Sequence, residues 1–123
     1  MNKIIPSSVD QAIVELEDSI LYNSFCDQLM KDFRLCGLST DDIKTENLDA
    51  LQQSLLIVIH HLLEKDVESL RALLYRIDLN EEKLVDLMTE GDEGQAERIS
   101  QALLIRVLQK VWYRLNLTSS DLK

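Results

Sequence analysis

The chain has few of the residues that interrupt helices, with three glycines and one proline among 123 residues. Cysteine is also scarce: there are two, and they do not form a CxxC pair. Scarce helix breakers favour helix over strand. A hydrophobic content of 46% is too high for a disordered chain. The length predicts a single helical domain over residues 1–123, large enough to form a core without metal or disulfide support.

The sequence also lacks an excess of basic residues. It contains 22 acidic and 13 basic residues, which gives a net charge of −9. Nonspecific nucleic-acid binding requires a basic footprint, and docking on an anionic membrane surface requires basic residues as well. The charge therefore argues against both nucleic-acid and membrane partners. It is suited to a neutral or basic protein partner, attracted by charge.

Long hydrophobic runs are absent too. The longest uninterrupted apolar run, Leu55 to Ile59, is far too short to cross a bilayer. The N-terminal residues MNKIIPSSVDQ lack the apolar region of a secretory signal, so we expect a cytoplasmic location. If Cys26 and Cys36 lie on one helix, they are roughly 15 Å apart along its axis, beyond the reach of a disulfide. We interpret both as reduced and partly buried.

Apolar residues do recur at helical spacing along most of the chain. Ser8 followed by Gln11 is a capping-box pattern that indicates a helix start. The apolar residues then change to another side of this first segment. This indicates either one long helix covered on different faces or a break near Asn23-Ser24. Gly37 is a plausible C-terminal cap.

Further helices are expected over about residues 46–64, 67–77, 81–88 and 95–117, with Asp66 as a cap and TEGDEGQ (89–95) as a loop. Between Leu55 and Leu63 the helix expected over residues 46–64 is apolar around nearly its whole circumference. This is typical of a helix in the middle of a bundle. The predicted fold is therefore all-α: a compact bundle of about five helices with this hydrophobic helix at its centre.

Two adjacent histidines follow that apolar run. His60, His61 and Glu64 could serve a metal-dependent or acid–base enzyme, which is the third functional hypothesis. However, a zinc site needs three or four converging ligands, and a di-iron bundle needs Glu-x-x-His on two helices. The sequence contains no HExxH, GxSxG or glycine-rich phosphate loop. We therefore predict no enzyme activity, cofactor or metal, and place both rings at the margin of a buried face.

The C-terminal part reverses the charge balance. Residues 1–100 carry 21 acids and 9 bases, whereas residues 101–123 carry one acid and four bases. Basic residues there could relieve a helix macrodipole or pair with acids inside the bundle. Trp, Tyr and Arg are also enriched at binding hot spots, and a basic strip on an acidic body suits self-association. The predicted protein-interaction surface comprises Arg106, Gln109, Lys110, Trp112, Tyr113 and Arg114.

Two segments carry a family resemblance: LLYRIDLNEEKL (73–84) and RISQALLIRVLQKVWYR (98–114). They resemble a group of short all-helical bacterial proteins of uncharacterised function. In these, a Leu-Tyr-Arg-Ile/Val-Asp junction precedes an acidic helix start, and the terminal helix ends with Gln-Lys and further basic residues. The resemblance covers the C-terminal half and implies a bacterial, cytoplasmic protein without a known catalytic residue. Physically, Tyr75, Arg76 and Asp78 are expected to form a helix end and cap.

These observations lead to one principal hypothesis and one alternative. The principal hypothesis is a non-enzymatic protein–protein interaction module, an adaptor or assembly component that binds an unidentified protein or forms a homodimer. The alternative is an acidic immunity-like, antitoxin-like or chaperone protein that masks a basic protein partner. Its binding surface would be acidic, with two candidate groups: Asp41, Asp42, Glu46 and Asp49, or Glu90, Asp92 and Glu93.

Overall fold

The structure is a computed structural model that describes residues 5–89, 91 and 93–116. Over these residues the chain is helical and contains no strand, which confirms the all-α prediction. Six helices are present where about five were expected. They are α1 (Val9–Glu15), α2 (Ser19–Leu35), α3 (Leu48–Lys65), α4 (Val67–Arg76), α5 (Glu81–Thr89) and α6 (Gln95–Asn116).

The extra helix arises because the first predicted segment is divided in two. The Oγ of Ser8 accepts a hydrogen bond from the N–H of Gln11, so the predicted start of α1 is confirmed. The division then falls at residues 16–18, where the carboxylate of Asp18 accepts the first free N–H groups of α2. Asn23 and Ser24 lie inside α2, so both sequence alternatives, an unbroken helix and a break at Asn23-Ser24, were wrong.

Two helices end with the same backbone motif. Gly37 follows α2 with φ 75°, and Asp78 follows α4 with φ 62°. In each case the next residue donates its N–H back into the last turn, from Leu38 to the Phe33 carbonyl at 2.9 Å and from Leu79 to the Leu74 carbonyl at 3.5 Å. This is the Schellman arrangement, which favours glycine but accepts Asp. The predicted helix ends at Gly37 and at the Arg-Ile-Asp junction are confirmed.

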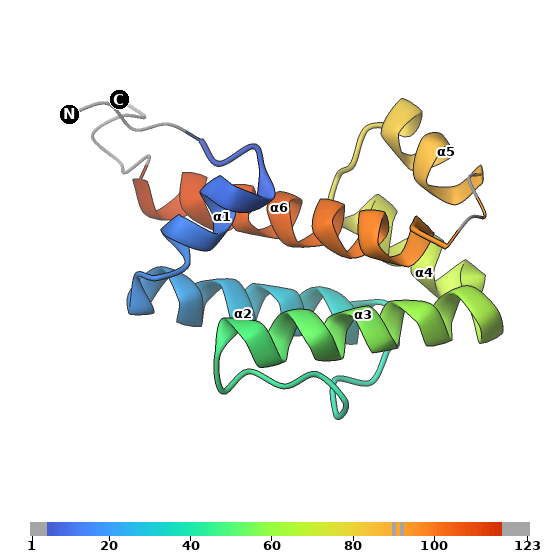
Figure 1. Cartoon of the computed structure of the whole chain (residues 1–123), viewed down its shortest axis with the longest axis horizontal. Helices are drawn as coiled ribbons and strands as arrows, with labels where there is room; N and C mark the ends of the chain where they lie inside the picture. The colour runs from blue at the N-terminus through green and yellow to red at the C-terminus, as the bar shows by residue number, and fades with distance from the viewer. Residues whose placement is uncertain (1–4, 90, 92, 117–123) are drawn as a thin grey trace.

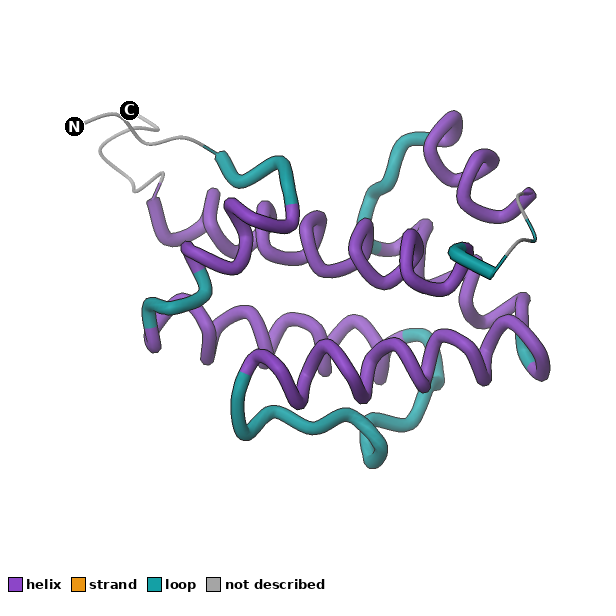
Figure 2. Tube along the Cα trace, in the orientation of Figure 1, coloured by secondary structure: helices purple, strands orange, loops and turns teal. Residues whose placement is uncertain are grey.

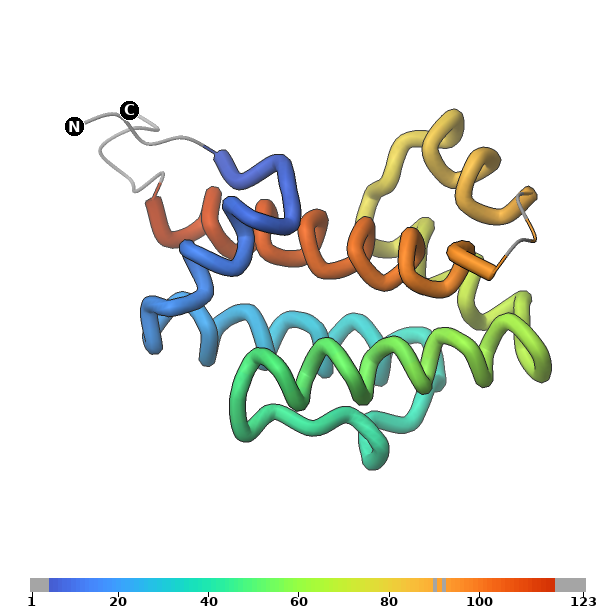
Figure 3. The backbone as a smooth tube through the Cα atoms, viewed as in Figure 1, coloured from blue at the N-terminus to red at the C-terminus, as the bar shows by residue number. Residues whose placement is uncertain are grey.

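Helix α6 is the element around which the others assemble (Figure 1). It packs against α1, α2, α3 and α5, while α4 contacts α2 and α3. The chain runs from the blue to the red end of Figure 3 so that α1 and the last turns of α6 lie at the same end of the bundle. The first and last described helices are therefore neighbours in space.

The buried apolar side chains form one cluster to which all six helices contribute. One side of α3 contributes to this cluster, but Ile57 is 67% exposed and both histidines are exposed on the outer side of the helix. The expected position of Leu55–Leu63 at the centre is therefore not confirmed, because the outer side of α3 faces solvent and the long α2–α3 loop (Figure 2). None of the helices in the described part of the chain is long and apolar enough to cross a membrane.

Candidate functional site

The basic strip, defined as Arg106, Lys110 and Arg114 on α6, reaches across to α2 and α4. Arg106 Nε donates to the carbonyl oxygen of Ile77, at the end of α4, over 3.0 Å. Arg114 Nη1 donates to Gln28 Oε1 on α2 over 3.0 Å. Lys110 Nζ lies 3.9 Å from Asp32 Oδ2, also on α2. The three basic residues of the predicted strip therefore all lie on α6, and each of them contacts another part of the bundle.

Asp32 is the centre of this cluster and is 0% exposed. Its Oδ1 accepts hydrogen bonds from Gln28 Nε2 and from Arg76 Nε, each at 3.1 Å. Its Oδ2 has no hydrogen-bond partner among the described residues and faces Lys110 at 3.9 Å. A buried carboxylate is costly unless cations and donors surround it. The contacts therefore favour the interpretation that Lys110 pairs with an acid inside the bundle. Arg76 pairs with the same acid.

The remaining predicted residues are divided between core and surface. Gln109 Nε2 donates to the Pro6 carbonyl over 2.7 Å and so ties the segment before α1 to α6. Trp112 is 4% exposed and belongs to the core, with its ring edge-on to Tyr113 at a centroid distance of 5.9 Å. Tyr113 and Arg114 are exposed. Of the predicted interaction surface, these two residues are the most accessible.

Sequence reasoning missed three members of the cluster: Gln28, Asp32 and Arg76. One signal could have identified Asp32, because it lies on α2 between Leu29 and Phe33, within an apolar stripe. A charged residue inside such a stripe needs a partner from a neighbouring element. No sequence pattern distinguishes Arg76 and Lys110 as its partners among the 13 basic residues.

Both cysteines are free thiols, and neither is activated. Burial raises the pKa of Cys36, with Arg76 opposing this shift and Asp32 adding to it. Burial also raises the pKa of Cys26, opposed by its hydrogen bond with Tyr22. The pKa of Tyr22 is raised as well, mainly by burial and then by Cys26. A raised thiol pKa keeps the sulfur protonated and weakly nucleophilic.

A second feature lies where the α2–α3 loop passes along α3 (Figure 2). Between them is a hollow of about 630 Å³, here named the loop groove. This volume is within the range typical of binding sites, about 300–1,000 Å³. Its floor and walls are largely apolar, with polar groups around them. The lining residues are Phe33, Leu38, Ser39, Asp42, Lys44, Ser54, Ile57, Val58, His61, Leu62 and Asp66.

The loop that borders this groove is held in place at several points. The N–H of Lys44 donates to the buried Ser54 Oγ over 2.9 Å. Tyr22 Oη donates to the Thr45 carbonyl over 3.1 Å. Ile43 is buried in the core cluster. The loop groove is therefore formed in the free protein, and a partner would not have to order the loop on binding.

One of the two histidines belongs to this groove. His61 lines it, and His60 and Glu64 are exposed. The described residues contain no group of three or more His, Cys, Asp or Glu placed to hold a metal ion. In the alternative acidic surface, Asp42 lines the groove, while Asp41, Glu46 and Asp49 are exposed nearby in the sequence. Glu90 and Asp92 of the other acidic group lie outside the described residues.

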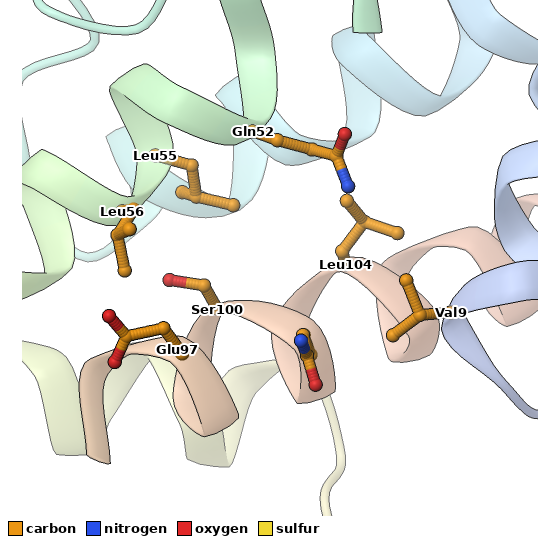
Figure 4. Close-up of a pocket in the computed structure, with 8 residues that line it drawn as sticks. Val9, Gln52, Leu55, Leu56, Glu97, Ser100 and Leu104 are labelled. Carbon is orange, nitrogen blue, oxygen red and sulfur yellow. The ribbon is translucent and has the colours of Figure 1, made fainter. Parts of the chain in front are cut away.

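A smaller cavity of about 130 Å³ lies between α1, α3 and α6 (Figure 4). It is lined by three leucines and Val9 and by the polar residues Gln52, Glu97 and Gln101, with Ser100 of α6 pointing toward α3. Ser100 Oγ is buried and has no hydrogen-bond partner in the described part of the chain. The volume is well below the roughly 300 Å³ at which ligand pockets begin. It is a small hollow that opens to solvent, since Glu97 and Gln101 of its lining are exposed, and the loop groove is the better candidate site.

Comparison of the chain with models of protein families, with curated proteins and with solved structures finds no match.

Proposed function

We propose that this protein is a non-enzymatic protein–protein interaction module, an adaptor or assembly component, that holds a protein partner in the loop groove. The observation that carries the proposal is a preformed groove with an apolar floor. Ile57, which is 67% exposed, stands on its wall. Exposed apolar surface next to a concavity with a polar border is characteristic of binding sites.

The proposal also accounts for the unusual composition of α3. The segment Leu55–Leu63 is apolar around nearly its whole circumference, yet Ile57 and part of Val58 face outward. A partner in the groove would cover these side chains and make α3 the enclosed central helix that its sequence predicts. From the sequence, we also propose that the protein is bacterial and located in the cytoplasm.

A charge introduced at Ile57 tests the groove directly. Ile57→Glu places a carboxylate on the apolar wall, while Val85→Glu makes the matched change on α5, at a residue that is 56% exposed. Both tagged variants and the wild type are used to capture partners from the source cell. A protein bound by wild type and Val85→Glu but lost with Ile57→Glu supports the proposal. Equal capture by all three would remove the groove as the binding surface.

A second surface is proposed for self-association: the exposed end of α6, where Tyr113 and Leu115 flank Arg114. Because Arg106 and Lys110 stabilise the bundle, reversing their charges would confuse folding with association. Tyr113→Ala with Arg114→Glu is the cleaner change, and Arg71→Glu on α4 is its control. Sedimentation should show an oligomer for the wild type and control that is lost in the double variant. A monomeric wild type would exclude this surface.

A further inference from the structure

The charged groups of the loop groove are mostly acidic. Asp42 and Asp66 line it, together with Lys44 and the imidazole of His61. The loop that passes along the groove, residues 39–46, also contains Asp41 and Glu46 and no base other than Lys44. The protein as a whole carries a net charge of −9, which extends the same sign beyond the groove. A partner with positive charge is therefore favoured electrostatically.

The carboxylate of Asp66 is held in a fixed position, and the backbone that carries Asp42 is anchored. Asp66 caps α4, where its Oδ2 accepts from Ser69 Oγ over 2.6 Å and its Oδ1 from the Ser69 N–H over 3.3 Å. A carboxylate has about four acceptor positions, so Asp66 retains capacity for a further donor. Asp42 precedes Ile43, whose side chain anchors the loop in the core. Acceptors fixed in advance lose little conformational entropy when a cation binds.

The floor of the loop groove is apolar, so an occupant must also present apolar side chains to it. Leu38 and Val58 are partly exposed in the lining, the buried Phe33 and Leu62 lie beneath it, and Ile57 projects at its edge. A rigid, open groove of this kind is suited to an amphipathic helix, whose side chains at positions i, i+3 or i+4, and i+7 enter the apolar floor. Such a helix would present lysine or arginine to the acidic border from its flanks.

We infer that the occupant of the loop groove is a basic amphipathic helix of a partner protein, with apolar side chains on the floor and Lys or Arg side chains at Asp42 and Asp66. This inference rests on the proposed function and adds the chemistry of the partner to it. It includes Asp42, one residue of the acidic surface in the sequence-based alternative.

The test uses three labelled peptides of about 18 residues, or five helical turns. The first has leucine on one face and lysine on the other. The second keeps the leucines and replaces lysine by glutamate. The third keeps the lysines and replaces leucine by serine. Fluorescence anisotropy with the full-length chain should show that the first peptide binds and the other two bind at least about ten-fold more weakly, since both floor and border contribute.

Two charge reversals locate the border. Asp42→Lys removes an acid from the groove, while Asp86→Lys makes the same change in net charge on α5. Asp42→Lys should weaken the leucine–lysine peptide about ten-fold, and this loss should shrink as salt rises from about 0.05 to 0.5 M. Asp86→Lys should have a much smaller effect. Equal effects of the two changes would mean attraction by net charge alone, which overturns the inference.

Ile57→Glu separates the inference from the proposed function. If it abolishes binding of every peptide while Asp42→Lys changes nothing, the groove binds partners but not through its acidic border. If no peptide binds the wild type, the basic-helix inference fails, and capture of a groove-dependent partner from the source cell decides the function independently. An oligomer that is present in the wild type and lost with Ile57→Glu would identify a second copy as the occupant and also overturn the inference.

Discussion

The basic strip and the loop groove both adjoin the C-terminal part of α2, where Asp32 faces α6 and its neighbour Phe33 lies beneath the groove. Beside the strip, Lys110 of α6 and Arg76 of α4 pair with a carboxylate that is 0% exposed. At the groove, carboxylates stand at the border of an open apolar hollow. Both regions contain opposite charges, but only the first brings them into contact across helices.

This difference shows that charge patterning in a sequence does not reveal whether the charge serves folding or binding. The strip was the more conspicuous pattern, because its basic residues recur every four positions in an acidic chain. In the structure, Arg76 and Lys110 pair with the buried Asp32, so these two basic residues stabilise the fold. The groove has no comparable sequence signature, because its lining comes from α2, the loop and α3.

Phe33→Ala is expected to have the largest effect on stability. The ring is fully buried, and its removal leaves a cavity below the groove. Loss of a buried Phe typically costs about 3–5 kcal/mol. Ile57→Ala, at the exposed edge of the same groove, should change the free energy of unfolding by less than about 0.5 kcal/mol. Urea denaturation followed by circular dichroism measures both, and similar losses would show that Ile57 belongs to the core.

Asp32→Ala should come next, with a loss of about 2–4 kcal/mol. It leaves Arg76 and Lys110 without their shared carboxylate, and the partial exposure of these two cations places the loss somewhat below that of a fully buried ion pair. Asp42→Ala provides the control at the groove and should be nearly neutral. Asp32→Asn keeps an acceptor for Gln28 and Arg76, so it should lose less than Asp32→Ala. An Asp32→Ala protein as stable as the wild type would contradict a structural role for the cluster.

Within the basic strip itself, Lys110→Glu should destabilise the protein by about 1–2 kcal/mol. The change brings a second carboxylate close to the buried Asp32, and like charges at such a distance repel. Arg114→Glu, at the exposed end of the same strip, should cost less than about 0.5 kcal/mol. Thermal unfolding of the two variants at the same net charge separates the inner from the outer part of the strip.

Alkaline pH should produce the smallest effect. The pKa values of Tyr22, Cys26 and Cys36 are all raised in the folded protein, largely by burial. Above about pH 8.5 for cysteine and about pH 10 for tyrosine, the unfolded chain loses protons that the folded chain retains. Stability should therefore decline as pH rises above these values. Tyr22→Phe with Cys26→Ala should flatten the decline in urea titrations, and an unchanged slope would exclude these groups as its cause.

Much of the secondary structure could be predicted, because its determinants are local. Ser8, Gly37 and Asp66 act as caps at the positions that their sequence neighbours suggested. The division between α1 and α2 was missed because Asp18 is one of many acids, and its capping role depends on the backbone turn that precedes it. Local patterns therefore located helices better than they located the turn between two of them.

The candidate sites were less predictable, because they depend on which helices meet. The spacing of Arg106, Lys110 and Arg114 gave their common face but not the acid that it covers. Trp112 was placed at a surface because aromatic residues are frequent at interfaces, whereas packing of α6 buries it. The loop groove depends on the hydrogen bond between Lys44 and Ser54, which fixes an irregular segment that periodicity does not describe.

The hydrogen bond from Gln109 to the Pro6 carbonyl joins residues 103 positions apart and has a consequence for synthesis on the ribosome. Of the six described helices, α1 is made first, and the element it packs against, α6, is made last. Helices α2, α3 and α5 also pack against α6, so the growing chain exposes their apolar faces until α6 has been made. A nascent chain stalled before α6 would be a substrate for chaperones and proteases, whereas a chain from which α6 has emerged can close the bundle.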